Sequence, residues 1–278
     1  MNAGRNQVAA CPVVVTVNLD IDALDAANAG AGGLFGRHSY GRYGARESVW
    51  RLLEVFNHEH IAATFFVMAD DAPRHRELVR AIVAGGHEVA IRGCVRAAMG
   101  QPADLGSLVR DRAAIADVAG VEPCGWRAVN GLVTADTLPE LARLGYVYDS
   151  SSQDDDTPYL MSDGNSAGLV ELPIFDYLTD ATFYTGRHSH ARVRRAWFEE
   201  ANAQYAAGAY INLTLHTRGE IGSGRAPRVQ VVADLVHHLR TLPGVGFYTA
   251  ADLARAWRSF APAEPFPIAF VPDIPQAP

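Results

Sequence analysis

Short apolar runs alternate with longer amphipathic stretches along most of this chain. The first run, Pro12 to Leu19, is nearly continuous in β-branched residues, as expected of a strand that is buried on both faces. The stretch from Glu47 to His58 has its apolar residues at helical spacing. Such alternation predicts βα units, in which each helix connects two parallel strands of one sheet.

The same pattern recurs downstream. About seven βα units predict an α/β fold, a distorted (β/α)7 barrel similar to a TIM barrel, with its functional site at the C-terminal ends of the strands. The expected strands after the first are 61–67, 88–91, 124–127, 146–149, 169–173, 210–215 and 245–248, and the expected helices after 47–58 are 74–84, 104–119, 134–144, 191–207, 229–239 and 250–257.

A doubly wound open sheet is the alternative architecture. Such sheets often carry a glycine fingerprint after the first strand. Gly30 to Gly33 is rich in glycine but lacks the spacing of a phosphate-binding loop. We therefore expect one barrel domain over residues 12–260, preceded by an N-terminal extension (1–11) and followed by a proline-rich tail (261–278).

The composition excludes several classes of function. With 278 residues and 49% hydrophobic content the chain can bury one substantial core, and no apolar run is long enough to predict a membrane span. The net charge of −7 is spread without a basic stripe, which argues against nucleic-acid binding. All 24 cationic side chains are arginine, so lysine Schiff-base chemistry is excluded. Three unpaired cysteines and the lack of a secretory signal favour the cytoplasm.

Two carboxylates stand where the first predicted strand ends, at Asp20 and Asp22. Their period-two spacing places both on one face of an extended chain. Neighbouring carboxylates perturb each other's ionisation, which suits a general base. The alternative is a pair of aspartates that only caps the loop.

A histidine ends a later predicted strand, in the run Ile211-Asn212-Leu213-Thr214-Leu215-His216. Its ordinary pKa allows proton exchange near neutral pH, so His216 is a candidate acid or base. A lone histidine is more often structural, but the C-terminal end of a barrel strand favours catalysis.

The run Gly86-His87-Glu88-Val89-Ala90-Ile91-Arg92-Gly93-Cys94-Val95-Arg96 resembles the second motif of the polysaccharide deacetylases, the NodB-homology enzymes. Asp20 to Asp22 resembles their first motif, Gly125 to Gly131 the third, and Leu213 to His216 the fifth. Tyr148 to Tyr159 resembles a branch that contains metal-free allantoinases, cyclic imide hydrolases and peptidoglycan deacetylase-like proteins. The resemblance spans nearly the whole chain and implies the NodB-homology fold.

The resemblance also implies roles for individual residues. Asp20 falls on the catalytic base, Asp22 on a metal-ligand position, and His216 on the acid that protonates the leaving group. Arg127 falls on the arginine that orients the base. Residues that would bind or enclose a small substrate are Asp22, Arg92, Arg96, Trp126, Asp155 and Tyr159.

The chain departs from the family at two metal positions, where Arg92 and Arg96 replace histidines. A guanidinium offers no lone pair to a cation and repels it, so we expect no metal and no other cofactor. The two arginines either replace the metal functionally, by polarising a carbonyl or holding a carboxylate, or fill a decayed site. Cys94 between them is a weaker candidate, as a nucleophile.

These observations predict a metal-independent hydrolase of a non-peptide C–N bond in a small amide, cyclic imide or ureide. A pseudoenzyme that binds a small anion is one alternative, and a lyase or isomerase is another. The expected partner is a small-molecule substrate, for which the arginines favour an anion. The resemblance and the apolar tail favour a homo-oligomer, a dimer or tetramer.

Overall fold

The computed structural model describes residues 8–29, 40–94, 104–162, 168–259 and 265–268. Within them the strands form one sheet that is parallel except where β6 meets β7. The strand order is β10 (Phe266–Pro267), β6 (Tyr159–Ser162), β7 (Leu169–Glu171), β5 (Tyr148–Asp149), β4 (Gly125–Arg127), β3 (Glu88–Arg92), β2 (Thr64–Met68), β1 (Cys11–Leu19) and β8 (Ile211–His216), and β9 (Val245–Tyr248) pairs with β1.

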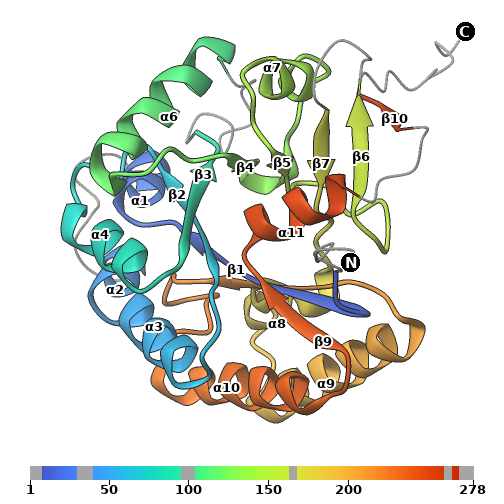
Figure 1. Ribbon diagram of the computed structural model, residues 1–278. Helices are drawn as coiled ribbons and strands as arrows, with labels where there is room; N and C mark the ends of the chain where they lie inside the picture. Colours follow the sequence, from blue (N-terminus) through green and yellow to red (C-terminus); the bar gives the residue numbers. More distant parts are fainter. Residues whose placement is uncertain (1–7, 30–39, 95–103, 163–167, 260–264, 269–278) are drawn as a thin grey trace, which may run out of the picture.

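Helices surround this curved sheet (Figure 1). They are α1 (Asp22–Ala29), α2 (Tyr40–Tyr43), α3 (Val49–His58), α4 (Arg76–Ala84), α6 (Leu105–Ala119), α7 (Thr137–Arg143), α8 (Asp180–Thr185), α9 (His190–Ala207), α10 (Ala226–Thr241) and α11 (Ala250–Arg258), with a π-helical turn at Gly44–Ser48 and 3-10 turns at Val129–Gly131 and Asp176–Leu178. None of these helices is long and apolar enough to cross a membrane.

Strand β1 pairs with three other strands, and all nine of its residues are buried. It pairs with β8 along Val13 to Asn18. On its other edge, its first half pairs with β9 and its second half with β2. Parallel pairing brings the C-terminal ends of β1, β2, β3 and β8 to one end of the sheet, which is where the candidate residues lie.

The apolar side chains form two main clusters. The larger packs the outer face of the sheet against the helices. The smaller fills the inside of the barrel with Val14, Phe66, Ala90, Tyr148 and other buried residues, and it includes the buried face of α11. The backbone N–H groups of Ala250 and Ala251 donate to side chains at the start of β2 and β3. Helix α11 therefore closes the barrel at the end where the strands begin.

The predicted α/β barrel-like fold and most of its elements are confirmed, with ends that differ by at most three residues. Helices α1, α2 and α8 and strands β6 and β10 were not predicted, because their segments are short and carry no clear periodicity. An isolated bridge, Thr179 to Thr214, rather than a pair of strands, links β8 to the segment after β7. The predicted domain limits stay predictions, since most of the tail lies outside the described residues.

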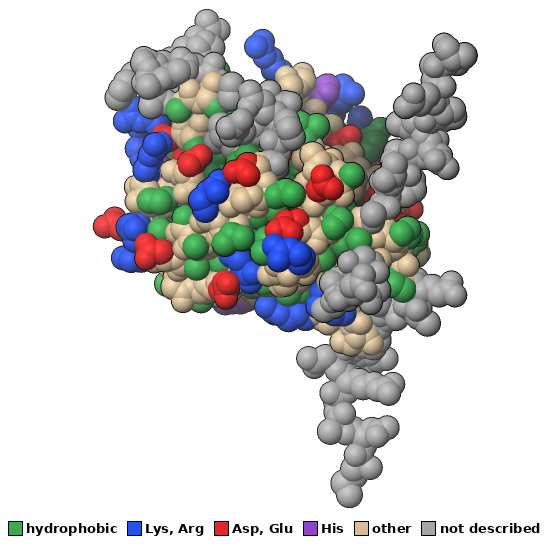
Figure 2. Space-filling view, turned by 90° about the horizontal axis from the view of Figure 1, so that it is seen from above, with side chains coloured by type: hydrophobic (Ala, Val, Ile, Leu, Met, Phe, Trp, Pro, Cys, Tyr) green, Lys and Arg blue, Asp and Glu red, His purple; other side chains and the backbone are tan. Residues whose placement is uncertain are grey.

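Charged side chains are mixed over the face shown in Figure 2. Acidic and basic groups alternate there between apolar side chains, and neither sign forms a continuous stripe. This arrangement agrees with the spread of charge along the sequence.

Gly125 offers a test of how tightly the barrel is packed. A β-carbon on it would lie 1.9 Å from the ring of Tyr148. Gly125→Ala should therefore lower the free energy of unfolding by about 2–3 kcal/mol, because the ring must move in a filled interior.

Gly106→Ala is the matched control. This glycine lies in α6, and the nearest atoms belong to the flexible ends of Arg110 and Asp104. Alanine there should leave stability unchanged or raise it by up to about 1 kcal/mol. Urea unfolding of the two variants measures the difference, and equal stabilities would contradict the packing described here.

Candidate active site

A cavity of about 610 Å³ opens at the end of the barrel opposite α11. Its deepest polar side chains come from strand residues, namely Asn18 on β1, Arg92 on β3, Arg127 on β4 and His216 on β8. Around them lie loop residues that are mostly small and polar: Asn130, Gly131, Ser151, Ser152, Gln153, Asp176, Thr179 and Thr182. A cavity of this size and polarity suits a small, polar molecule.

Arg92 and Asp20 form a buried ion pair at this cavity. Nε of Arg92 lies 3.2 Å from Oδ1 of Asp20, and both side chains are less than a tenth exposed. Nη1 of Arg92 donates to the carbonyl oxygen of Ala128. The guanidinium is thus held from two sides, and its positive charge lies beside the carboxylate on which the family base falls.

Asp71 holds the backbone that carries Asp20. Its carboxylate accepts from the N–H groups of Ile21 and Ala23, at 3.1 and 2.8 Å. Burial raises the pKa of Asp71 to about 6, although the two backbone hydrogen bonds and the nearby His75 oppose the shift. Asp71 therefore fixes the turn from β1 into α1.

Asp22 has a different partner from Asp20. Helix α1 begins at Asp22, so the alternation of the strand ends there. Oδ2 of Asp22 lies 3.0 Å from Nε2 of His75, whereas Asp20 is bound to Arg92. Strand alternation therefore does not relate the positions of the two aspartates.

Arg127 lies inside the barrel, 1% exposed, with its guanidinium over the ring of Phe66. Nη1 donates to Thr16 and Asn18, at 3.0 and 3.2 Å, and Nε and Nη2 donate to Ser150. Burial, and then the charge of Arg92, lower its pKa to about 10. These contacts link Arg127 to Asn18 rather than to Asp20, which it was expected to orient.

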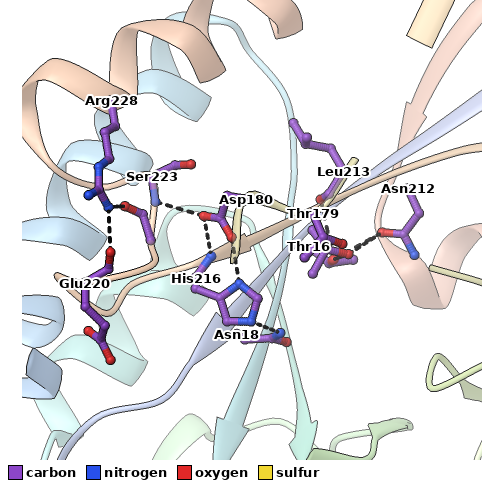
Figure 3. A network of polar contacts seen from close by, with 12 residues as sticks. Thr16, Asn18, Thr179, Asp180, Asn212, Leu213, His216, Glu220, Ser223 and Arg228 are labelled. Atoms are coloured by element: carbon purple, nitrogen blue, oxygen red, sulfur yellow. Dashed lines mark hydrogen bonds and ion pairs between the residues drawn. The ribbon is translucent and has the colours of Figure 1, made fainter. Parts of the chain in front are cut away.

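His216 lies between Asp180 and Asn18 (Figure 3). Its Nδ1 is 2.7 Å from Oδ1 of Asp180, and its Nε2 is 3.0 Å from Nδ2 of Asn18. The other oxygen of Asp180 accepts from the backbone N–H groups of His216 and Ser223, at 2.9 and 2.8 Å. Asp180 is fully buried, so the histidine ring is held on both sides by groups that are themselves fixed.

The direction of these hydrogen bonds follows from Arg127. A guanidinium only donates, so the atom of Asn18 that faces it is the amide oxygen. The amide nitrogen of Asn18 therefore faces His216 and donates to Nε2, which must carry a lone pair. The proton of the neutral ring is then on Nδ1, where it donates to Asp180. His216 is thus presented as a proton acceptor.

A buried pair of carboxyl groups supports the other side of the cavity. Asp149 and Glu171 are fully buried partners on β5 and β7. Burial, followed by the charge of Asp149, raises the pKa of Glu171 well above its ordinary value. Ser151 donates its backbone N–H to Glu171 and its hydroxyl to Asp149. The same hydroxyl accepts from the N–H of Ala128. The pair therefore fixes Ala128, whose carbonyl holds Arg92.

Several predicted binding residues lie elsewhere. Trp126 is 2% exposed and packs in the core between sheet and helices, since its ring is on the outer face of β4. Asp155 and Tyr159 line other cavities, beside Phe266. These three do not line the 610 Å³ cavity, so their part in substrate binding stays a prediction. Cys94 is half-buried, and Arg96 lies outside the described residues.

The prediction from sequence missed Asn18, Asp71 and Asp180. Asn18 had a signal, because Thr16, Asn18 and Asp20 alternate as polar residues within an otherwise apolar strand. Asp71 and Asp180 had none, since each is an ordinary loop or helix-start aspartate in the sequence. Only the fold brings them to the site.

Comparison with known proteins shows what the chain is similar to. Residues 41–148 match the family model of polysaccharide deacetylase. This segment, 108 of the 278 residues, is similar to a polysaccharide deacetylase domain. A peptidoglycan deacetylase from Helicobacter pylori is 29% identical to it over 172 residues, a match that covers 58% of this chain and 57% of that protein's length.

Solved structures show the same domain architecture. A protein from Mycobacterium smegmatis classed as a polysaccharide deacetylase superposes with a TM-score of 0.80 and 28% identity, covering 93% of both chains. PuuE allantoinase superposes with a TM-score of 0.76 over 92% of this chain and 93% of that one. At 22% identity, this second likeness shows the fold alone.

The tautomer of His216 can be tested directly. Nitrogen-15 NMR at neutral pH should show Nδ1 protonated and Nε2 unprotonated. Asn18→Asp should leave Nε2 protonated, because a carboxylate would accept from both Arg127 and His216. Asn202→Asp is the control, since the amide oxygen of Asn202 already faces Nε2 of His238 on the surface, and this substitution should leave the His216 signals unchanged. A protonated Nε2 in the unchanged protein would show that the assigned direction is wrong.

Proposed function

We propose that this protein is a metal-independent hydrolase of a non-peptide C–N bond in a small amide, cyclic imide or ureide. The coarse class, a hydrolase of the deacetylase type, rests on the family match and on the Helicobacter pylori relative. The observation that carries the finer proposal is the buried ion pair of Arg92 with Asp20, which puts a fixed positive charge beside the family base.

The donor set does not fit the family's metal. Arg92 occupies one ligand position and already binds Asp20, and the carboxylate of Asp22 is bound to His75. In the described part of the chain, His, Cys, Asp and Glu side chains form no group of three that would hold a metal ion. We therefore derive the chemistry from protein groups alone.

The orientation of His216 suggests that this residue acts first as the general base and then as the general acid. Nε2 of neutral His216 would exchange its hydrogen bond with Asn18 for one with a water molecule. It would then take a proton from that water as the water oxygen attacks the carbonyl carbon. The resulting imidazolium, stabilised by Asp180, would return that proton to the nitrogen as the C–N bond breaks. The guanidinium of Arg92 would stabilise the negative charge on the carbonyl oxygen. Asp20 would then position the guanidinium of Arg92, and it would not accept the proton of the attacking water.

The substrate class follows from the cavity and the missing Lewis acid. A guanidinium activates a carbonyl less than a divalent cation does, so the carbonyl must already be reactive, as in an imide or a strained ring. The enclosed cavity suits a small molecule better than a polymer. The allantoinase among the structural neighbours adds ureides to the compounds worth testing.

Turnover should be measured on a panel of small cyclic imides, ureides and N-acetyl sugars, with hydrolysis followed by incorporation of labelled water oxygen. We expect activity on an imide or ureide, and unchanged rates after dialysis against a metal chelator. A loss of activity on chelation that added zinc or cobalt restores would contradict metal independence. Ligand binding without any turnover would instead favour an anion-binding pseudoenzyme.

Substitutions should separate the roles of the site residues. His216→Ala should lower kcat/KM by about a thousandfold, as expected for loss of a general base. Asp20→Asn should lower it by only roughly ten- to a hundredfold, as for loss of a supporting group. Asp22→Asn is the control, since it removes the same charge two residues away, and it should change the rate little. Equal losses for Asp20→Asn and His216→Ala would make Asp20 the base.

A further inference from the structure

A second cavity, of about 570 Å³, lies beside α8, α9 and α10, away from the cavity at the strand ends. Cationic side chains dominate its lining: Arg187, His188, His190, Arg225 and Arg228. We call it the basic pocket. Nothing in the proposed hydrolysis uses it, although the chain as a whole carries a net charge of −7.

The arginines of the basic pocket are not paired with acidic side chains. None of the three forms an ion pair with a carboxylate of the described residues. Glu220 is the one acidic residue that lines the pocket among them, and its Oε1 is bound to Nε of Arg218 at 2.6 Å. Burial lowers the pKa of Arg228, and the charge of Arg225 adds to this, whereas Tyr184 and Asp180 act against it. The pocket therefore concentrates positive potential that an anion could neutralise.

Two of the arginines are held in place. The guanidinium of Arg225 lies 4.7 Å from the ring centre of Tyr43, and its Nε donates to the carbonyl of Gly219. The guanidinium of Arg228 lies 4.1 Å from the ring centre of Tyr184. Groups fixed in this way lose little entropy when they bind a ligand.

Arg187 has a strained backbone at the rim of the basic pocket. Its φ is 56°, in the left-handed region, whereas Gly186 beside it has a φ of −76°. The chain thus places the costly conformation on the arginine and not on the adjacent glycine, at a cost of about 1 kcal/mol or more. Such strain often marks a position that serves binding.

The hydroxyl of Tyr184 is a further sign that a partner is missing. Tyr184 lines the basic pocket and is 3% exposed, and its hydroxyl has no hydrogen-bond partner among the described residues. A buried hydroxyl without a partner costs about 1–3 kcal/mol. Because this oxygen is closed to solvent, an oxygen-rich ligand would satisfy it only after a turn of the Tyr184 side chain toward the pocket.

The basic pocket is connected to His216 by a short chain of contacts, part of which Figure 3 shows. Nη1 of Arg228 donates to the carbonyls of Glu220 and Gly222, at 3.2 and 2.9 Å. The next residue, Ser223, donates its N–H to Asp180, the partner of His216. A ligand that pulls on Arg228 would therefore move the loop that fixes Asp180.

We infer that the basic pocket binds a phosphate group, free or as part of a small phosphomonoester, and that its occupancy is coupled to His216 through Ser223 and Asp180. A tetrahedral dianion offers several acceptor oxygens to the three guanidinium groups that line this pocket. This inference goes beyond the proposed hydrolysis and does not depend on it.

Calorimetric titration with inorganic phosphate and with glycerol 3-phosphate, at constant ionic strength, tests the site. We expect saturable binding, and the tighter of the two probes tells whether the free or the esterified group is preferred. Arg187→Gln and Arg225→Gln should each weaken binding roughly tenfold, as for loss of one charge-assisted contact. Arg187 is exposed, so its replacement should not disturb folding.

Arg195→Gln is the matched control, because it removes the same charge from an exposed position of α9 that does not line the pocket. It should bind phosphate like the unchanged protein. Absence of saturable binding, or an equal loss in Arg195→Gln, would overturn the site. The coupling has its own readout, since phosphate should shift the imidazole nitrogen-15 signals of His216. Binding that leaves these signals unchanged would overturn the coupling, whether or not the protein hydrolyses anything.

Discussion

A guanidinium inside a barrel must have its donors satisfied, and Arg127 imposes this condition on the residues around it. It lies over Phe66 in the interior, where water does not compete, and it binds Thr16, Asn18 and Ser150. Because it can only donate, it decides which end of the Asn18 amide faces His216. The protonation pattern of the site thus originates in a residue that need not touch a substrate.

Arg92 is a second buried guanidinium, at the mouth of the barrel, and its charge is paired with Asp20. A buried ion pair gains little net stability, because desolvation of both charges offsets their attraction. The pair with Asp20 is nevertheless held on several sides, through Ala128, the carboxyl pair of Asp149 and Glu171, and the turn fixed by Asp71. So much support around one charge is more consistent with a working site than with a decayed one. A covalently attached cation also cannot be lost or exchanged, unlike a metal ion.

The sequence predicted the barrel and the end of it at which the candidate residues meet. Apolar runs such as Pro12 to Leu19 set the strands, and parallel pairing then brings Asp20, Arg92, Arg127 and His216 together. Partners within the site were harder to predict. Strand alternation could not relate Asp20 to Asp22, because α1 starts at Asp22.

Other details depended on contacts between distant segments. Asp71 and Asp180 reach the site across 50 and 36 residues of chain, respectively, and no local pattern marks them. Trp126 was misplaced because an aromatic side chain on a strand can face either side of the sheet, and its side is decided by packing. Sequence patterns therefore give the positions along strands better than the contacts between them.

Strand β1 and the helix that closes the barrel lie at opposite ends of the described chain. Strand β2, a partner of β1, follows within about fifty residues, yet β8 and β9 come about two hundred residues after β1, and α11 comes after both. During translation the edge of β1 that pairs with β8 must therefore stay unpaired until most of the domain has left the ribosome. Folding of this protein is expected to be slow and dependent on chaperones, and truncation before α11 would leave a chain prone to aggregation.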